Sequence, residues 1–191
     1  MNELSLGRRR FAFGLPLAAA ACGASPEPNY YTIVPRNGPT LPRGPKVVLL
    51  KDIGLASYLD RREIVRSSEG YKLDIRANDW WGEPLAGLIG RILVVELLQR
   101  LPNSSVYSES GAINVDHNCI VGVNIQRLDA DRAGSLILVA QVAAEFNRPR
   151  RTAARTFTIS KPLATPDTPG LVAAISDALG ELADGIATLL Q

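Results

Sequence analysis

The first 22 residues constrain this chain most, because they decide which part of it folds and in which compartment. Three arginines at residues 8–10 precede an apolar stretch at 11–17, and four alanines then lead to Cys22. A basic segment, an apolar segment and a small-residue cleavage site, in that order, are typical of a secretory signal peptide. Because a cysteine directly follows the small residues, we expect cleavage before Cys22 and acylation of its thiol and its freed amine.

Two other interpretations of this leader stay open. The leader could be a plain signal peptide with a chance cysteine, or a short membrane helix. The apolar stretch from Phe11 to Ala21 is about half of the roughly 20 residues that span a bilayer, which disfavours a spanning helix. The arginines followed by Phe11 also resemble a twin-arginine export signal, so the sequence does not decide between Sec and twin-arginine export.

Cleavage before Cys22 divides the chain into a signal peptide at 1–21, a tether at 22–29 and a single domain at 30–191. This remaining length is enough for one domain with a hydrophobic core. The leader takes three of the 21 basic residues and one of the 19 acidic residues, so the mature chain is close to neutral. A neutral chain argues against nucleic acid as a partner, because nucleic acid binding requires a basic surface.

Cysteine usage and tether length set two further limits. The chain has only two cysteines, Cys22 and Cys119. If Cys22 is acylated, Cys119 has no partner within the chain, so the core and not a disulfide must stabilise this exported protein. A tether of this length reaches at most about 25 Å, so we expect the domain to sit close to its membrane.

The hydrophobic pattern predicts an α+β fold. Helical spacing of apolar residues predicts helices at 84–101 and 169–190, the second capped by Thr168 with Pro169 at its first position. Strands are predicted at residues 30–34, 46–52, 63–67, 71–76, 106–108, 119–128, 135–146 and 152–159. Short turns join the last three strands into an antiparallel meander.

The order of these elements, four strands and a helix repeated twice, suggests an internal β-α duplication. Each amphipathic helix must bury its apolar stripe against a sheet. We therefore expect a mixed, mostly antiparallel sheet or sheets with both helices packed on it.

Reactive residues are sparse. The one histidine, His117, lies two residues before Cys119. A structural zinc site needs about four ligands, usually in two spaced pairs, and the sequence holds no second pair. It also holds no Gly-x-Ser-x-Gly motif, which marks many serine hydrolases. We therefore predict no catalytic residue, no metal, no cofactor and no enzymatic activity.

Two surface features carry alternative interpretations. The densest charge of the mature chain is formed by Arg148, Arg150 and Arg151. These arginines are either a solvated hairpin tip or a contact for lipid headgroups or an acidic partner. The Trp80-Trp81 pair precedes the first predicted helix. It is either part of the core or an interface anchor, since aromatic residues are enriched at interfaces.

Three stretches together resemble the PqiC/YmbA family of ABC-type transport auxiliary lipoproteins. They are Tyr-Tyr-Thr-Ile at 30–33, Ser-Tyr-Leu-Asp-Arg-Arg-Glu-Ile-Val at 57–65 and Asn-Asp-Trp-Trp-Gly-Glu-Pro-Leu at 78–85. The last stretch leads into a helix that ends at Leu101-Pro102, as in the family. The chain departs from the family pattern at Arg62, where proline is frequent, and at Trp80, where arginine is common.

The resemblance implies a non-enzymatic adaptor. Family members accompany MCE-domain proteins and their ABC transporters, which move lipids or other apolar molecules between the inner and outer membranes, and some form homo-oligomeric rings. Gly23 follows Cys22, where aspartate would favour the inner membrane, so an outer-membrane lipoprotein facing the periplasm is expected. The candidate docking residues are Tyr58, Leu59, Asp60, Arg61, Trp80 and Trp81. The alternatives are a lipoprotein that carries lipid itself or one that assists outer-membrane assembly, without an MCE partner.

Overall fold

The computed structural model describes residues 27–113 and 115–191, so the signal peptide and Cys22 lie outside the described residues. Along the chain, the strands and helices are β1 (Asn29–Tyr31), β2 (Val47–Leu50), β3 (Gly54–Leu55), β4 (Glu63–Ser67), β5 (Asp74–Trp81), α1 (Leu85–Arg100), β6 (Ser105–Ser108), β7 (Cys119–Ala130), β8 (Ser135–Asn147), β9 (Arg150–Pro162) and α2 (Thr168–Leu189). Within these residues, no helix is long and apolar enough to cross a membrane.

The strands form one large and one small sheet. The large sheet has the order β6-β2-β7-β8-β9, and β3 pairs with β7 beyond the end of β2. Its β7-β8-β9 part is the predicted antiparallel meander, whereas β2 pairs in parallel with both β6 and β7. The small sheet has the order β1-β5-β4, with β1 parallel to β5. The predicted mixed α+β fold is confirmed.

The two halves of the chain pair their strands differently. The strands before α1 are divided between the two sheets, while all strands between α1 and α2 join the large sheet. Five strands precede α1 and four lie between α1 and α2, so the predicted repeat of four strands and a helix is not exact, and it does not build two equal units. The reason is that β2 enters the large sheet between β6 and β7, so the halves share one core.

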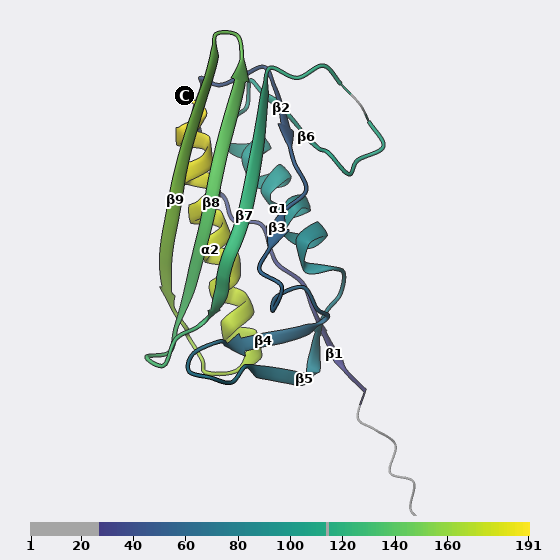
Figure 1. The fold of residues 1–191 in the computed structure, drawn as a ribbon, viewed down its shortest axis with the longest axis vertical. Coiled ribbons are helices and arrows are strands. Elements are labelled where there is room, and N and C mark those ends of the chain that lie inside the picture. Colours follow the sequence, from purple (N-terminus) through teal and green to yellow (C-terminus); the bar gives the residue numbers. More distant parts are fainter. Residues whose placement is uncertain (1–26, 114) are drawn as a thin grey trace, which may run out of the picture.

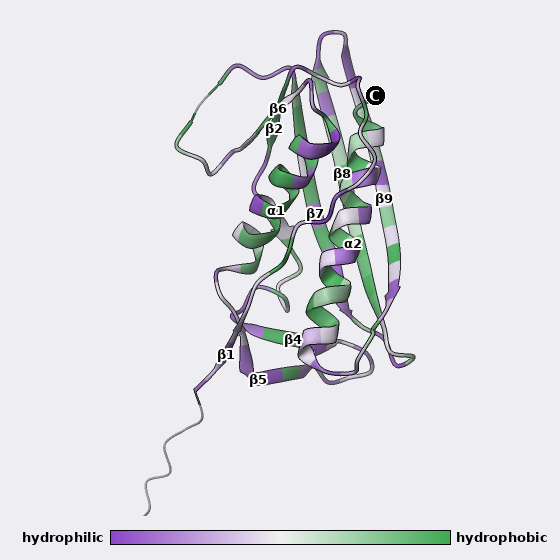
Figure 2. Ribbon diagram, turned by 180° about the vertical axis from the view of Figure 1, so that it is seen from behind, coloured by the Kyte–Doolittle hydropathy of each residue, from purple (hydrophilic) through white to green (hydrophobic). Residues whose placement is uncertain are grey.

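Both helices cover the same face of the large sheet (Figures 1 and 2). Alternate residues of β7, such as Val121 and Val123, point toward the helices and are buried, because a strand turns successive side chains to opposite faces. The helices add Leu88, Ile92 and Leu182 to this core. The opposite face of the meander carries no helix and is called the open face below.

A buried arginine ties the two helices together. Arg100, at the end of α1, is only 1% exposed and pairs with Asp184 of α2. Its guanidinium also donates to the carbonyl oxygens of Gly180 at 2.9 Å and Arg36 at 3.0 Å. A buried cation is tolerated only when its donors are satisfied, so these contacts fix α2 and residues 36–38 against α1.

The cap of α2 differs from the prediction by one residue. Asp167, not Thr168, is the N-cap, and its carboxylate accepts from the Gly170 amide at 3.0 Å. Thr168 is the first helical residue, and its hydroxyl donates to Asp79 of β5. Asp and Thr both suit a cap position. Here the Thr168 hydroxyl bonds Asp79 instead, and this contact attaches the start of α2 to the small sheet.

The elements define two ends of an elongated molecule. The chain enters at β1, beside β5 and β4 and near the start of α2, and this region is called the tether end (Figure 1). The β8-β9 hairpin tip, residues 43–46 and the end of α2 meet at the opposite, distal end (Figure 1). Because β8 has 13 residues, it separates the ends by roughly 40 Å at about 3.3 Å per residue.

Candidate partner-binding surfaces

The structure brings the two predicted docking segments together at the tether end. The amide of Trp81 donates to the carbonyl of Arg62 at 2.7 Å, and Glu63 lies opposite Trp80 in the β4-β5 ladder. A surface hollow of about 340 Å³ lies between them, lined by Asp60, Arg61, Arg62, Trp81, Glu83, Pro84 and Leu85. Segments that are some 20 residues apart in sequence thus form one surface.

Only part of the predicted set is available to a partner. Leu59 is 3% exposed and Trp81 is 6% exposed, so both belong to the hydrophobic core and not to a docking surface. The reason is that Trp81 ends β5 facing inward and Leu59 is buried in the turn before β4. Asp60 is exposed, while Arg61 and Trp80 are half-buried.

Trp80 forms an aromatic and cationic cluster beside the entry of the chain. Tyr30 of β1 meets it edge-on, with ring centroids 6.0 Å apart. The Arg62 guanidinium stacks over the Trp80 ring at 4.2 Å, a cation–π contact. Tyr30 itself remains 67% exposed. Arg62 stands where the family often has proline, and in this chain it contributes a contact that proline does not offer.

Tyr58 takes part in a buried network that the sequence did not reveal. Its hydroxyl donates to Asp129 at 2.7 Å, and the same carboxylate accepts from Ser68 at 2.6 Å and from Arg127 at 3.0 Å. Asp129 is fully buried. Burial and the adjacent carboxylate raise the pKa of Tyr58 to about 12. Tyr58 therefore attaches the segment before β4 to β7, and its role is structural.

The predicted strand at 119–128 stops before Asp129, which would place this residue in the turn that leads to the strand at 135–146. The structure extends β7 to Ala130, because a bulge between Ile125 and Arg127 shifts the alternation and keeps the strand paired with β8. The signal that could have found this site is the alternation Leu128-Asp129-Ala130, which continues the strand pattern through the carboxylate.

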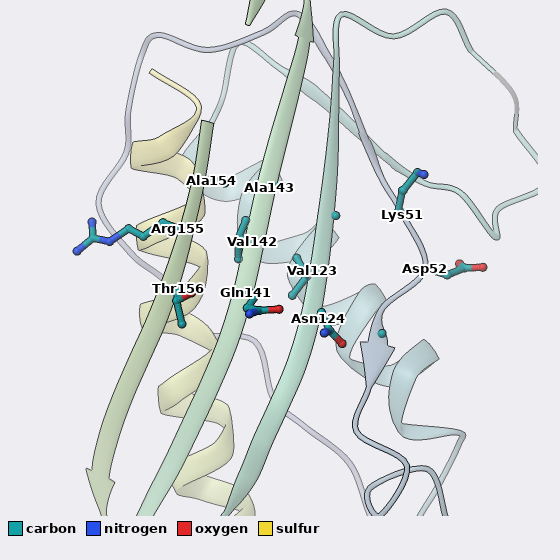
Figure 3. Close-up of a pocket in the computed structure, with 12 residues that line it drawn as sticks. Lys51, Asp52, Val123, Asn124, Gln141, Val142, Ala143, Ala154, Arg155 and Thr156 are labelled. Carbon is teal, nitrogen blue, oxygen red and sulfur yellow. The ribbon is translucent and has the colours of Figure 1, made fainter. Parts of the chain in front are cut away.

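A second hollow lies on the open face of the large sheet (Figure 3). Its volume is about 630 Å³. The small residues Gly122, Ala143 and Ala154 lie side by side across β7, β8 and β9 and form its floor. Asn124 and Gln141 face each other in the next row, so the hollow offers amide groups beside small apolar side chains (Figure 3).

The distal end is basic. Arg148, Arg150 and Arg151 are all exposed at the β8-β9 tip, and Arg151 stacks over the ring of Phe146 at 3.5 Å. Beside them a hollow of about 280 Å³ is lined by Lys46, Asn118, Arg148, Arg151 and Gln191, among others. The predicted hairpin tip is confirmed, and the structure adds Lys46 to the same surface.

The thiol of Cys119, near this end, is not activated. Cys119 is buried, and burial raises the pKa of its thiol to about 11. A thiol that stays protonated at neutral pH is a poor nucleophile. Over residues 27–113 and 115–191, no group of three metal-ligating side chains comes together.

A family model for the ABC-type transport auxiliary lipoprotein component matches residues 31–187. The chain belongs to this family. The match includes the motifs at 57–65 and 78–85, so the PqiC/YmbA-like family predicted from them is confirmed. Auxiliary components of this kind belong to ABC transport systems, so the chain has a transporter as its partner.

Solved structures share the fold of this auxiliary lipoprotein. A crystal structure of an uncharacterised protein covers 87% of this chain and all of its own, with TM-score 0.72 and 16% identity. A Xanthomonas campestris protein described as family DUF330 covers 83% of this chain and 92% of its own, with TM-score 0.67 and 18% identity. No curated protein matches the sequence.

Proposed function

We propose that this auxiliary lipoprotein is a non-enzymatic adaptor, anchored in the outer membrane through acylated Cys22 and facing the periplasm. It docks an MCE-domain protein of an ABC transport system that moves lipids or other apolar molecules between the two membranes. The family supports the transport role. The leader and Gly23 after Cys22 support the anchor and its outer-membrane position.

The observation that carries this proposal is the position at which the chain enters the domain. β1 begins at Asn29, at the tether end. Residues 22–28 span at most about 25 Å, so acyl chains on Cys22 hold the tether end near the bilayer. The distal end then points into the periplasm, where a partner from the inner membrane arrives. An adaptor at the end of a transport route requires this orientation, with one end of the domain at the bilayer and the other toward the periplasm.

The residues around the tether-end hollow support a second contact with the partner there, beside the bilayer that the partner's end must reach. Asp60 and Arg61 line a concave surface, and Trp80 precedes Trp81, which also lines it. Aromatic residues and arginine are enriched in interface centres. Apolar cargo that crosses water must be shielded, because exposed apolar area costs about 25 cal/mol per Å². Copies of the chain arranged as a ring around the partner's end would close that route.

Purification of the tagged full-length protein from cells in mild detergent tests this proposal. We expect the MCE-domain protein to co-purify with the wild type and to be reduced with Cys22→Ser, which removes the anchor. Recovery of a stoichiometric outer-membrane barrel instead would support an assembly role. Native mass spectrometry of the same sample tests the alternative that the protein carries lipid itself. An acyl ligand retained by the isolated domain would support that alternative.

A further inference from the structure

The distal end gathers basic side chains that form no ion pair with any residue that the structure describes. Among the described residues, none of its five basic side chains takes part in an ion pair; they are Arg43, Lys46, Arg148, Arg150 and Arg151. Most other described cations are paired, for example Arg66 with Asp74 and Lys161 with Glu181. Positive charge is thus concentrated at one end of a chain whose mature part as a whole is nearly neutral.

These cations are held in place by the fold. Arg151 stacks on Phe146, and the Asn147 amide donates to the carbonyl of Asn118 at 2.9 Å, which joins the hairpin tip to the start of β7. The side chain of Gln191 donates to the carbonyl of Arg43, which brings residues 43–46 to the same surface. Lys46, Arg148 and Arg151 then line one hollow. A solvated tip alone would not need these connections.

Two kinds of partner could meet such a surface: an anionic bilayer or an acidic protein. The tether end and the distal end are roughly 40 Å apart along β8, and the tether spans at most about 25 Å. An anchor at the tether end therefore keeps the distal end away from the bilayer that holds the acyl chains, unless the domain lies flat. The position favours a protein that approaches from the periplasm.

We propose that the distal end is a docking surface for an acidic protein surface, with Arg148 and Arg150 as its exposed contact residues. This inference rests on the proposed function for the direction of approach and adds the chemistry of the partner. Charges arranged in this way steer association and raise its rate, an effect that salt screens. The hollow of about 280 Å³, lined by Lys46, Arg148 and Arg151, has room for a carboxylate side chain.

The test compares two charge-matched double variants of the full mature chain in detergent. Arg148→Glu with Arg150→Glu reverses two exposed cations of the distal end and leaves Arg151 stacked on Phe146. The control, Lys72→Glu with Arg132→Glu, reverses two exposed cations that line neither the distal hollow nor the open-face hollow. Binding is measured by surface kinetics against the purified MCE-domain protein, a decaglutamate peptide and vesicles containing phosphatidylglycerol, each at two salt concentrations.

We expect the distal variant to slow association with the MCE-domain protein by at least about tenfold at low salt and to lose its salt dependence, with the control within about twofold of wild type. Decaglutamate binding should fall in the same way. Equal binding of the partner by wild type and distal variant would overturn the inference and leave the proposed function standing. Loss of vesicle binding alone would assign the surface to lipid and would also overturn it. Decaglutamate binding at the distal end without any binding of the MCE-domain protein would contradict the proposed function only.

Discussion

The Tyr58 hydroxyl donates a 2.7 Å hydrogen bond to the fully buried carboxylate of Asp129, 71 residues away in the chain. This contact joins the motif at 57–65 to the end of β7, the central strand of the large sheet. Ser68 and Arg127 complete the set of donors around the same carboxylate. The tyrosine of the family motif is therefore explained in this chain by the stability of the fold, independently of any partner.

Tyr58→Phe should destabilise the protein by about 1–3 kcal/mol, because it removes a donor from a buried, charged acceptor. Chemical denaturation of the soluble domain measures this loss. Tyr107→Phe is the matched control, since no hydrogen bond from its hydroxyl is found among the described residues, and it should change the free energy of unfolding by less than about 0.5 kcal/mol. Equal losses for the two variants would contradict the role assigned to Tyr58.

Glu96 should make stability depend on pH in an unusual direction. Burial raises the pKa of its carboxyl to about 7, against the opposing effects of the Arg36 amide and the Arg100 charge. One oxygen accepts from the Arg36 amide at 2.7 Å, and the other is buried without a partner among the described residues. The folded state therefore binds the proton more tightly than the unfolded state.

From this difference, stability contributed by Glu96 is fully present below its unfolded pKa near 4.5 and is lost as pH rises to about 7. The loss is on the order of 3 kcal/mol at about 1.4 kcal/mol per pKa unit. Glu96→Gln should flatten this part of the profile and be more stable than wild type at pH values well above 7. Thermal unfolding between pH 4.5 and 8 measures both curves, and parallel curves would show that Glu96 does not titrate as described.

Arg100→Met should cost about 1–3 kcal/mol, because it removes a buried cation whose hydrogen-bond acceptors include Asp184, itself 38% exposed. The carbonyls of Gly180 and Arg36 lose a donor as well. Arg91→Met on the same helix is the control, since its pair with Glu83 is exposed and should contribute at most about 1 kcal/mol. Denaturant unfolding compares the two, and a loss for Arg100→Met no larger than that for Arg91→Met would contradict the account of the helix pair.

Local pattern predicted the fold class and most elements of this protein. The helices, the meander and the antiparallel β4-β5 pair have signals within a short window: helical spacing, alternation and turn residues. The parallel partners of β2 could not be predicted, because nothing near residues 47–50 indicates that they pair with residues 105–108 and 119–121. The same reasoning explains why β3, only two residues long, was missed.

The sequence predicted which segments form the candidate surface, but only some of the residues that are exposed on it. Motif residues mark the segments that meet at the tether end, yet a motif does not say which side chains point outward. Leu59 and Trp81 are buried because they complete the core, and Tyr58 is held by a carboxylate far along the chain. The Arg62 stacking on Trp80 and the unpaired cations at the distal end depend on tertiary contacts.

The account depends most on Cys22, which determines where the domain is held. Intact-mass analysis of the protein purified from membranes tests it directly. We predict a chain that begins at Cys22 and carries the added mass of a diacylglycerol and an amide-linked acyl chain, with Cys22→Ser recovered without acyl mass. A mature chain that begins elsewhere, or that begins at Cys22 with no acyl mass, would contradict the account.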